Sequence, residues 1–146
     1  MIDYARAGDL LATYGRAWET FDGDAWVALF SADAEYHEDP FGEPLVGHNA
    51  LRAYLLEASA SQRDVEFSVE RHWVSGPTIL AAWRATFIRR ATGRVVRMAG
   101  FLTAEVGPDG RISRFREWTR YGPEGRGSER RIDGRRPVVR CRQRLR

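Results

Sequence analysis

The sequence has no lysine and a single cysteine, and these two shortages exclude several kinds of chemistry. All 23 basic residues are arginine, so no lysine can form a Schiff base with a carbonyl substrate. Cys141 cannot form a disulfide within the chain or supply a multi-cysteine metal site. No three residues of metal-ligand type stand at metal-binding spacing. We therefore expect neither a metal nor another cofactor.

Long apolar runs are also missing. No stretch approaches the ~18 residues of a membrane span, and the first residues lack the basic and apolar segments of a signal peptide. We therefore expect a cytoplasmic protein without a membrane partner. The chain has 146 residues, about the size of one domain, and its 43% hydrophobic and 29% charged residues are typical of globular proteins.

Charge is unevenly distributed along the chain. Residues 1–121 contain 14 arginines and 17 acidic residues, whereas residues 122–146 contain 9 arginines and 3 acidic residues. We predict one folded domain over residues 1–121 and a flexible, arginine-rich tail over residues 122–146. Such a tail can hold phosphates, but it lacks aromatic residues that stack on bases. We do not expect nucleic acid to be a partner.

Helices are indicated mainly in the first half of the chain. Apolar residues recur every three or four positions from Asp3 to Thr20, which predicts an amphipathic helix. Asp22-Gly23-Asp24 ends it, and either aspartate can cap a short helix from Ala25 to Phe30. Another helix follows Gly47. Its apolar face consists of Leu51, Tyr54, Leu55 and Ala58.

The remaining segments predict strands, because apolar and polar residues alternate between turn signals. The predicted strands are Ala34–Asp39, Val65–Trp73, Thr78–Arg90, Arg94–Val106 and Arg111–Arg120. In the second of them, one face is expected to hold Val65, Phe67, Val69, Arg71 and Trp73. Helices followed by a meander of four strands indicate the α+β class. We expect a cone-shaped, curved antiparallel sheet wrapped around the N-terminal helices, with a pocket on its concave side.

Four segments carry a family resemblance within Leu10 to Arg120. They are Ala28-Leu29-Phe30 followed by Asp33-Ala34, Asp39-Pro40-Phe41-Gly42-Glu43-Pro44 leading to Gly47, the Asp109-Gly110-Arg111-Ile112 turn, and the Phe115-Arg116-Glu117-Trp118 strand. With the order of elements, they resemble the nuclear transport factor 2-like superfamily, which includes SnoaL-like polyketide cyclases, ketosteroid isomerases and limonene epoxide hydrolases. The resemblance implies a SnoaL-like domain, but the superfamily hosts many chemistries.

Asp39 and Tyr14 are the first catalytic candidates that the resemblance implies. In the ketosteroid isomerases an Asp-Pro-Phe-Gly segment carries the general base, which corresponds to Asp39 here. A carboxylate facing an apolar cavity gains basicity by desolvation. Tyr14 matches the tyrosine that donates to the oxyanion. The alternatives are that Asp39 only opens a turn and that Tyr14 is a core residue.

The sequence also departs from the isomerase pattern. The second oxyanion donor, a protonated aspartate, falls at Leu102, and we expect no acid nearby on the same face. Another tyrosine of that site falls on Leu55, with Tyr54 expected to point elsewhere. One extra residue between Tyr14 and Asp39 requires a bulge or register shift. In the isomerases these donors stabilise the enolate. Because this sequence lacks them, we do not expect an efficient steroid isomerase.

Glu117 and His37 are further candidates. Alternation places Phe115, Glu117 and Thr119 on one face, which the resemblance directs into the cavity, and SnoaL-like enzymes place an acidic residue on this strand. The alternative is an ion pair of Glu117 with Arg84 or Arg97. His37 lies two residues before Asp39 and could share a proton with it, or belong to a solvated edge.

We predict Asp39, Tyr14 and Glu117 as catalytic residues. The predicted substrate-binding residues are Trp18, His37, Phe41, Tyr54, Leu55, Trp83, Phe87, Leu102 and Phe115. A cavity lined in this way suits a flat or polycyclic apolar ligand. The leading hypothesis is a cofactor-free SnoaL-like enzyme that isomerises, cyclises or opens an epoxide in a small apolar metabolite. The alternative is a non-catalytic module that binds a ligand or dimerises, and we expect a homodimer.

Overall fold

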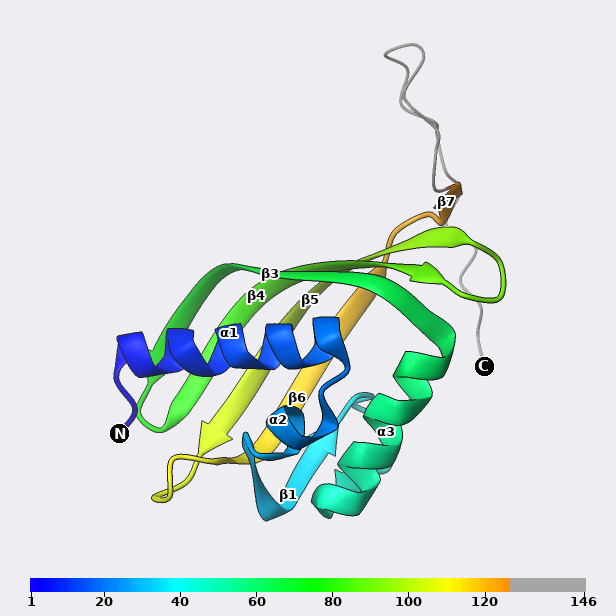
Figure 1. Ribbon diagram of the computed structural model, residues 1–146. Helices are drawn as coiled ribbons and strands as arrows, with labels where there is room; N and C mark the ends of the chain where they lie inside the picture. The colour runs from blue at the N-terminus through cyan, green and yellow to red at the C-terminus, as the bar shows by residue number, and fades with distance from the viewer. Residues whose placement is uncertain (127–146) are drawn as a thin grey trace.

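The computed structural model describes residues 1–126 (Figure 1). Within these residues three helices accompany one sheet, and the α+β class predicted from the sequence is confirmed. Most of the predicted arginine-rich tail, residues 127–146, lies outside the described residues. None of the helices within residues 1–126 is long and apolar enough to cross a membrane.

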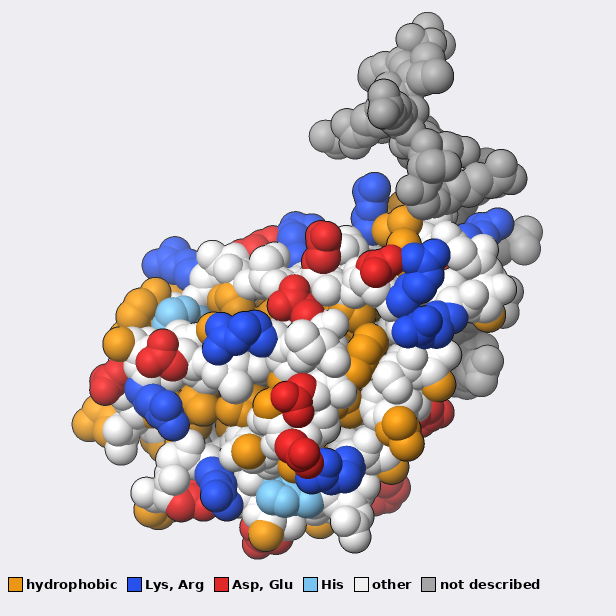
Figure 2. Space-filling view, viewed as in Figure 1, with side chains coloured by type: hydrophobic (Ala, Val, Ile, Leu, Met, Phe, Trp, Pro, Cys, Tyr) orange, Lys and Arg blue, Asp and Glu red, His pale blue; other side chains and the backbone are white. Residues whose placement is uncertain are grey.

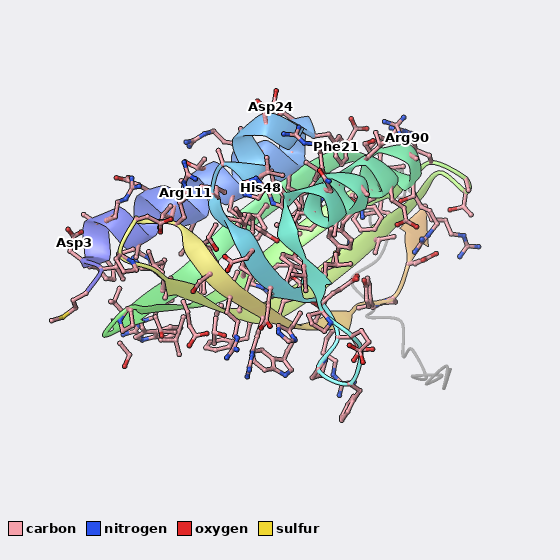
Figure 3. The ribbon with its side chains drawn as sticks, turned by 90° about the horizontal axis from the view of Figure 1, so that it is seen from below. Asp3, Phe21, Asp24, His48, Arg90 and Arg111 are labelled. Carbon is pink, nitrogen blue, oxygen red and sulfur yellow. The ribbon has the colours of Figure 1, made fainter. Side chains whose placement is uncertain are left out.

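The helices begin at aspartate caps where the sequence offers them. Helix α1 covers Tyr4–Thr20, and the Asp3 side chain accepts a hydrogen bond from the Arg6 backbone N–H at 2.7 Å. Asp3 and Phe21 mark the two ends of this helix in Figure 3. Helix α2 covers Gly23–Val27 and is capped by Asp22. It ends earlier than predicted because Phe30 already belongs to the first strand.

Helix α3 covers Gly47–Ser61 and is joined to the first strand by a side-chain contact. Nε2 of His48 lies 2.8 Å from the carbonyl oxygen of Phe30 (Figure 3). Leu51 and Leu55 are the buried residues of α3, as its apolar periodicity predicts.

The strands form a single curved sheet that covers the helices (Figure 1). They are β1 Phe30–His37, β2 Leu45–Val46, β3 Gln62–Ser75, β4 Thr78–Arg89, β5 Arg94–Val106, β6 Ile112–Tyr121 and β7 Gly125–Arg126. The spatial order is β2-β1-β6-β5-β4-β3, with β7 paired to β5. Because β7 pairs Arg126 with Arg94, regular pairing continues past the domain boundary predicted at residue 121.

Strands β3 to β6 form the predicted antiparallel meander. The sheet as a whole is mixed, because β1 pairs with β6 in the parallel direction. This pairing joins the first long strand to the last one of the meander, a non-local contact that alternation along the sequence does not reveal. A register shift in β1 falls between Phe30 and Glu35, and it confirms the predicted irregularity between Tyr14 and Asp39.

A second irregularity reverses the faces of β3. The register shifts between Val69 and Arg71, and the strand then turns Trp73 outward, where its side chain is 39% exposed. Trp73 packs beside Phe101 on the outer face of the sheet, with ring centroids 6.2 Å apart. The prediction that Arg71 and Trp73 share the buried face of Val65 is therefore wrong, because a bulge inserts one residue into the alternation.

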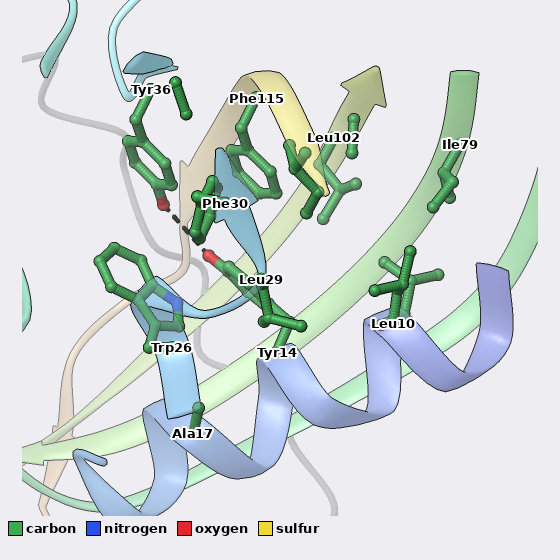
Figure 4. Packing of buried hydrophobic residues seen from close by; sticks show 14 of the residues in the cluster. Leu10, Tyr14, Ala17, Trp26, Leu29, Phe30, Tyr36, Ile79, Leu102 and Phe115 are labelled. Carbon is green, nitrogen blue, oxygen red and sulfur yellow. Dashed lines mark hydrogen bonds between the residues drawn. The ribbon is translucent and has the colours of Figure 1, made fainter. Parts of the chain in front are cut away.

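The core lies between α1 and the inner face of the sheet (Figure 4). Leu10, Tyr14 and Ala17 of α1 are buried there. Helix α1 can approach β3 closely because Gly15 has no side chain, and a Cβ at that position would overlap the Phe67 ring. Charged side chains of both signs are spread over the face that carries α1 (Figure 2). The helices leave part of the inner face uncovered beyond this core, and the candidate site lies there.

Candidate functional site

A cavity of about 1160 Å³ lies between α1, α3 and the inner side of the sheet. It is somewhat larger than the range of roughly 300–1,000 Å³ that is typical of small-molecule sites. Nearly half of the residues that line it are aromatic. They are Tyr14, Trp18, Trp26, Tyr36, Phe41, Tyr54, Trp83, Trp118 and Tyr121.

Two tyrosine hydroxyls meet at the wall of this cavity. The hydroxyl oxygens of Tyr14 on α1 and Tyr36 on β1 are 3.1 Å apart (Figure 4). The Tyr36 ring stacks on Phe115 at 4.7 Å between centroids, which fixes its orientation. Burial is the main cause that raises the pKa of each tyrosine well above its usual value. Both hydroxyls therefore keep their protons and can donate hydrogen bonds.

Glu117 on β6 is the acidic side chain with the most altered pKa in the cavity. Desolvation by burial raises the pKa of its carboxyl to about 8, and the charge of Glu38 adds to this effect. An interaction with the Tyr36 hydroxyl acts in the opposite direction. Glu117 is therefore mostly protonated at neutral pH, and it can give up its proton within a short range of pH.

The ion pair considered for Glu117 does not form. Arg84 instead pairs with Glu70, and within residues 1–126 Glu117 forms no ion pair. The expectation that no acid lies near Leu102 on its face is wrong, because Leu102 and Glu117 are cross-strand partners. Residues that are directly opposite each other on neighbouring strands share a face of the sheet.

Glu38 and Tyr36 also line the cavity, and the sequence reasoning missed both. The signal was present in β1, where Ala34 and Tyr36 are buried and alternation continues to position 38. The predicted site residues His37 and Asp39 alternate with Tyr36 and Glu38 along the chain. Glu38 also raises the pKa of Tyr54, although burial has the larger effect.

Asp39 lies at the exposed mouth of the cavity. Its Oδ1 accepts a hydrogen bond from the Phe41 backbone N–H at 2.9 Å, and its backbone carbonyl accepts one from Gly42. This geometry is that of an Asx turn, the structural alternative considered above. Phe41 follows at the rim of the cavity, where the residue is 97% exposed.

Trp18 and Trp83 form another part of the cavity wall. The Trp18 indole N–H donates to Oε1 of Gln62 at 2.9 Å, and the two tryptophan rings meet edge to face. Trp83 lies against Gly100, its cross-strand partner, where any Cβ would overlap the indole. The indole N–H groups of Trp83 and Trp26 are buried without a hydrogen-bond partner within residues 1–126. Packing therefore determines the position of these two rings.

Helix α3 contributes both of its candidate residues to the cavity. Tyr54 and Leu55 line it together. Tyr54 also stacks on Trp26, with ring centroids 6.0 Å apart. The expectation that Tyr54 points elsewhere is wrong, because these neighbouring residues of the helix border the same space.

Four predicted substrate-binding residues do not line the cavity. Leu102 and Phe115 are buried in the main core. Phe87 packs with Val65 and Val96 in a separate cluster. The His37 ring lies 3.4 Å from the Glu35 carboxylate, in the charged network of β1 and β6 that includes Arg114.

The part of the chain that the structure describes contains no group of three histidine, cysteine or acidic side chains suited to a metal ion. A second, smaller hollow of about 490 Å³ lies between α1 and β3. It does not include Glu117 or the tyrosine pair. The three predicted catalytic residues therefore all belong to the larger cavity.

Comparisons with known proteins agree with this architecture. A family model described as a SnoaL-like domain matches residues 11–115. No curated protein matches the chain. Several solved structures share the fold at 20% sequence identity or less.

Three of these structures illustrate the range of the fold. The epoxide hydrolase/cyclase-like enzyme SalBIII, which acts in pyran ring formation in salinomycin, has a TM-score of 0.72 and 20% identity over 82% of this chain and 94% of its own. A computationally designed 17-OHP binder has a TM-score of 0.69 and 20% identity over 80% and 98%. A hypothetical protein from Catenulispora acidiphila with a ketosteroid isomerase-like fold, in complex with trimethylamine, has a TM-score of 0.68 and 13% identity over 75% and 83%.

Proposed function

Because the chain belongs to the SnoaL-like domain family, we propose that it is a cofactor-free enzyme that transfers a proton to or from a small, largely apolar molecule in the cavity. Relatives in fold include a hydrolase/cyclase-like enzyme and a designed binder. Because these relatives include both an enzyme and a binder, we propose the reaction class from the residues of the site. Isomerisation, cyclisation and epoxide opening all need a proton donor or acceptor beside an apolar substrate.

The observation that carries the proposal is the Glu117 carboxyl, whose pKa is raised to about 8 in an aromatic cavity. A general acid or base works best when its pKa lies near the working pH. An ordinary surface glutamate, with a pKa near 4.5, holds almost no proton at neutral pH. Glu117 can donate a proton at neutral pH and can recover it afterwards.

The tyrosine pair is proposed as the hydrogen-bond donor to a developing oxyanion. Tyr14 and Tyr36 share one hydrogen bond at 3.1 Å, which leaves one hydroxyl proton of the pair for another acceptor. Donors fixed in place before the reaction stabilise new negative charge without reorganisation. Asp39, at the mouth of the cavity, is proposed as a second catalytic carboxylate, as the resemblance to the isomerases implies.

Ligand binding is proposed for the aromatic wall. Trp18 and Trp83 present one side of the cavity, Tyr54 and Leu55 of α3 present another, and Phe41 lies at the rim. These surfaces suit a flat or polycyclic apolar molecule. A ligand that covered Phe41 would also remove its exposed ring from water, which is favourable by about 25 cal/mol per Å².

The test is a turnover assay with two probes, a β,γ-unsaturated ketone and a terminal epoxide. We expect conversion of at least one probe, and we expect Glu117→Gln to reduce kcat about 100-fold or more. Glu66→Gln is the matched control, because Glu66 is exposed on β3 outside the cavity. Equal rates for the Glu117→Gln variant and the wild type would contradict the role of Glu117.

A non-catalytic ligand-binding module of the same fold is the second candidate. The specific observation in its favour is the Asx turn of Asp39, which holds the implied base at an exposed position. This candidate predicts that both probes bind without conversion and that Asp39→Asn leaves binding unchanged. Loss of conversion in Asp39→Asn would favour the enzyme.

We also propose a homodimer that buries the outer face of the sheet. Trp73 and Phe101 lie together there, and the Arg71 guanidinium lies 5.1 Å from the Trp73 ring centroid. Sedimentation velocity should show a dimer that Trp73→Asp dissociates. Leu56→Asp is the control, because Leu56 is an exposed apolar residue on α3. A monomeric wild type would contradict this arrangement.

A further inference from the structure

The cavity combines aromatic rings with an excess of acidic groups. Its acidic lining residues are Glu38, Asp39 and Glu117, whereas Arg120 is its one cationic residue among those described. Nine aromatic residues share the lining. An anion would not be attracted by the acidic groups, and a hydrocarbon would interact with the aromatic rings alone.

We propose that the ligand of this cavity is an organic cation, a largely apolar molecule that carries an ammonium group. The inference rests on the proposed function, because it assigns a chemical class to the molecule bound at that site. It adds a positive charge to the small apolar metabolite that the sequence predicts.

The aromatic lining favours a cation for electrostatic reasons. The face of an aromatic ring carries partial negative charge, and an ammonium group within about 6 Å of a tryptophan or tyrosine ring is attracted to it. Trp26, Tyr36 and Tyr54 are packed against one another, with centroids 5.4–6.0 Å apart. All three border the cavity, and the half-buried Tyr54 ring is the one most open to a ligand, because Trp26 and Tyr36 are only 1% exposed.

The acidic groups add to this preference. An anionic ligand would enter beside Glu38 and Asp39 and would have Arg120 as its one counter-charge among the described lining residues. A neutral apolar ligand would leave the Glu117 carboxyl protonated and would gain no charge attraction from it. An ammonium group can pair with that carboxyl once its proton has left for solvent.

Binding of a cation should therefore be linked to release of the Glu117 proton. The titratable groups around this carboxyl come from every element that borders it. They are Tyr14 of α1, Tyr36 of β1, Glu38 and Asp39 of the following loop, Tyr54 of α3, and Arg120 and Tyr121 of β6. The tyrosines stay protonated because burial raises their pKa values. Glu117, which is half-buried and has a pKa of about 8, changes charge between pH 6 and 8.5.

Linkage is reciprocal, so a cation that lowers the pKa of Glu117 must bind more tightly as the pH rises through 8. The bound cation would also convert Glu117 from a proton donor into a carboxylate base. Proton abstraction from the ligand would then be the reaction step that the ligand-bound site favours.

The experiment compares two molecules of equal shape, phenyltrimethylammonium and tert-butylbenzene. The first carries a permanent charge that does not titrate, and the second is its neutral carbon analogue. Binding to the full-length chain is followed by isothermal titration calorimetry or ligand-observed NMR at pH 6 and pH 8.5. We expect the affinity for phenyltrimethylammonium to rise about tenfold or more over this range. The affinity for tert-butylbenzene should fall or stay constant.

Glu117→Gln should remove the pH dependence of cation binding, and Glu66→Gln should retain it. The wild-type comparison alone keeps the test decisive if the Glu117→Gln variant does not fold. Tighter binding of tert-butylbenzene than of the cation at pH 8.5 would overturn the inference, while the cavity would remain a binding site for apolar ligands. No binding of either molecule would overturn the inference and also count against the proposed function.

Discussion

Leu102 on β5 and Glu117 on β6 are directly opposite each other, and their side chains lie on the inner face of the sheet. The resemblance to ketosteroid isomerases places a protonated acid at the position of Leu102. This chain has a leucine there, but the neighbouring strand supplies a carboxyl whose pKa is raised to about 8. A protonated acid therefore remains in this part of the fold, displaced by one strand.

Because the acid lies on β6, a tyrosine of β1 interacts with it. Tyr36, whose ring stacks on Phe115, interacts with Glu117 and also with Tyr14. A steroid-type reaction was not expected from the sequence because a second donor was missing. Glu117 does supply a protonated group in the cavity at neutral pH, but from β6 and not from the position of Leu102.

The first prediction concerns stability as a function of pH. Glu117 has a higher pKa in the folded state, about 8, than its ordinary value of 4.5. Between these values the folded protein binds more protons than the unfolded chain, so the contribution of Glu117 to stability falls as the pH rises. This contribution is fully present below pH 4.5 and is lost as the pH passes 8. Its slope is at most about 1.4 kcal/mol per pH unit.

Urea denaturation of the wild type and of Glu117→Gln between pH 5 and 8.5 measures this effect. The difference in free energy of unfolding between them should shrink or reverse as the pH rises. Glu66→Gln should follow the wild type at each pH. A difference that does not change with pH would show that Glu117 has an ordinary pKa.

A second prediction distinguishes the effects of Glu38 and Asp39 on the pKa of Glu117. The charge of Glu38 raises the pKa of Glu117, so Glu38→Gln should lower that pKa. The titration can be followed by the side-chain carboxyl ¹³C chemical shift of Glu117. Asp39→Asn is the matched control, because the adjacent Asp39 is not among the causes of the shift. A larger effect of Asp39→Asn than of Glu38→Gln would contradict the arrangement of charges in the cavity.

Local sequence patterns were sufficient to predict the helices and the meander. Apolar spacing located α1, and an aspartate stands at the start of α1 and of α2. The parallel pairing of β1 with β6 could not be predicted in this way, because it joins segments far apart in the chain. The bulge after Val69 was equally hidden, since a bulge changes which face a residue occupies without changing the composition.

The site could be predicted only in part. Alternation shows which face of the sheet a residue occupies, but it does not show whether that part of the strand borders the cavity. Trp83 and Phe87 lie on the same face of β4, yet Trp83 lines the cavity and Phe87 packs in a separate cluster. Glu38 was missed for a different reason. The resemblance of the Asp-Pro-Phe-Gly segment implied that Asp39 faces the cavity. The burial of Tyr36 instead indicates that Glu38, two residues later, lies on the inner face.

A third prediction tests the close approach of Trp83 to Gly100. A Cβ at position 100 would overlap Cζ2, Cε2 and Nε1 of the indole, so Gly100→Ala should destabilise the fold by about 1–3 kcal/mol. Gly125→Ala is the control, because nothing lies near that position. Trp83→Phe removes the indole atoms that would clash. Gly100→Ala should therefore cost less in the Trp83→Phe background when unfolding free energies are compared in a double-mutant cycle.

Equal costs in both backgrounds would show that Gly100 is required for a reason other than the indole. Near-UV circular dichroism gives a second readout, because a displaced Trp83 changes its contact with Trp18.

The last prediction concerns the hydroxyl that links the tyrosine pair to the acid. The Tyr36 interaction lowers the pKa of Glu117 by favouring the charged carboxylate, so Tyr36→Phe should raise that pKa above 8. Tyr14→Phe removes the other hydroxyl of the same 3.1 Å pair, but Tyr14 is not among the causes of the Glu117 shift. At pH 6, where Glu117 is protonated in the folded protein, both variants lose the Tyr14–Tyr36 hydrogen bond and should be destabilised by about 1 kcal/mol. Their stabilities should therefore match at this pH, while the Glu117 titrations, followed by carboxyl ¹³C shifts, differ. If both variants moved the pKa of Glu117 equally, the hydroxyls would act on it as one unit, and Tyr36 would have no separate role.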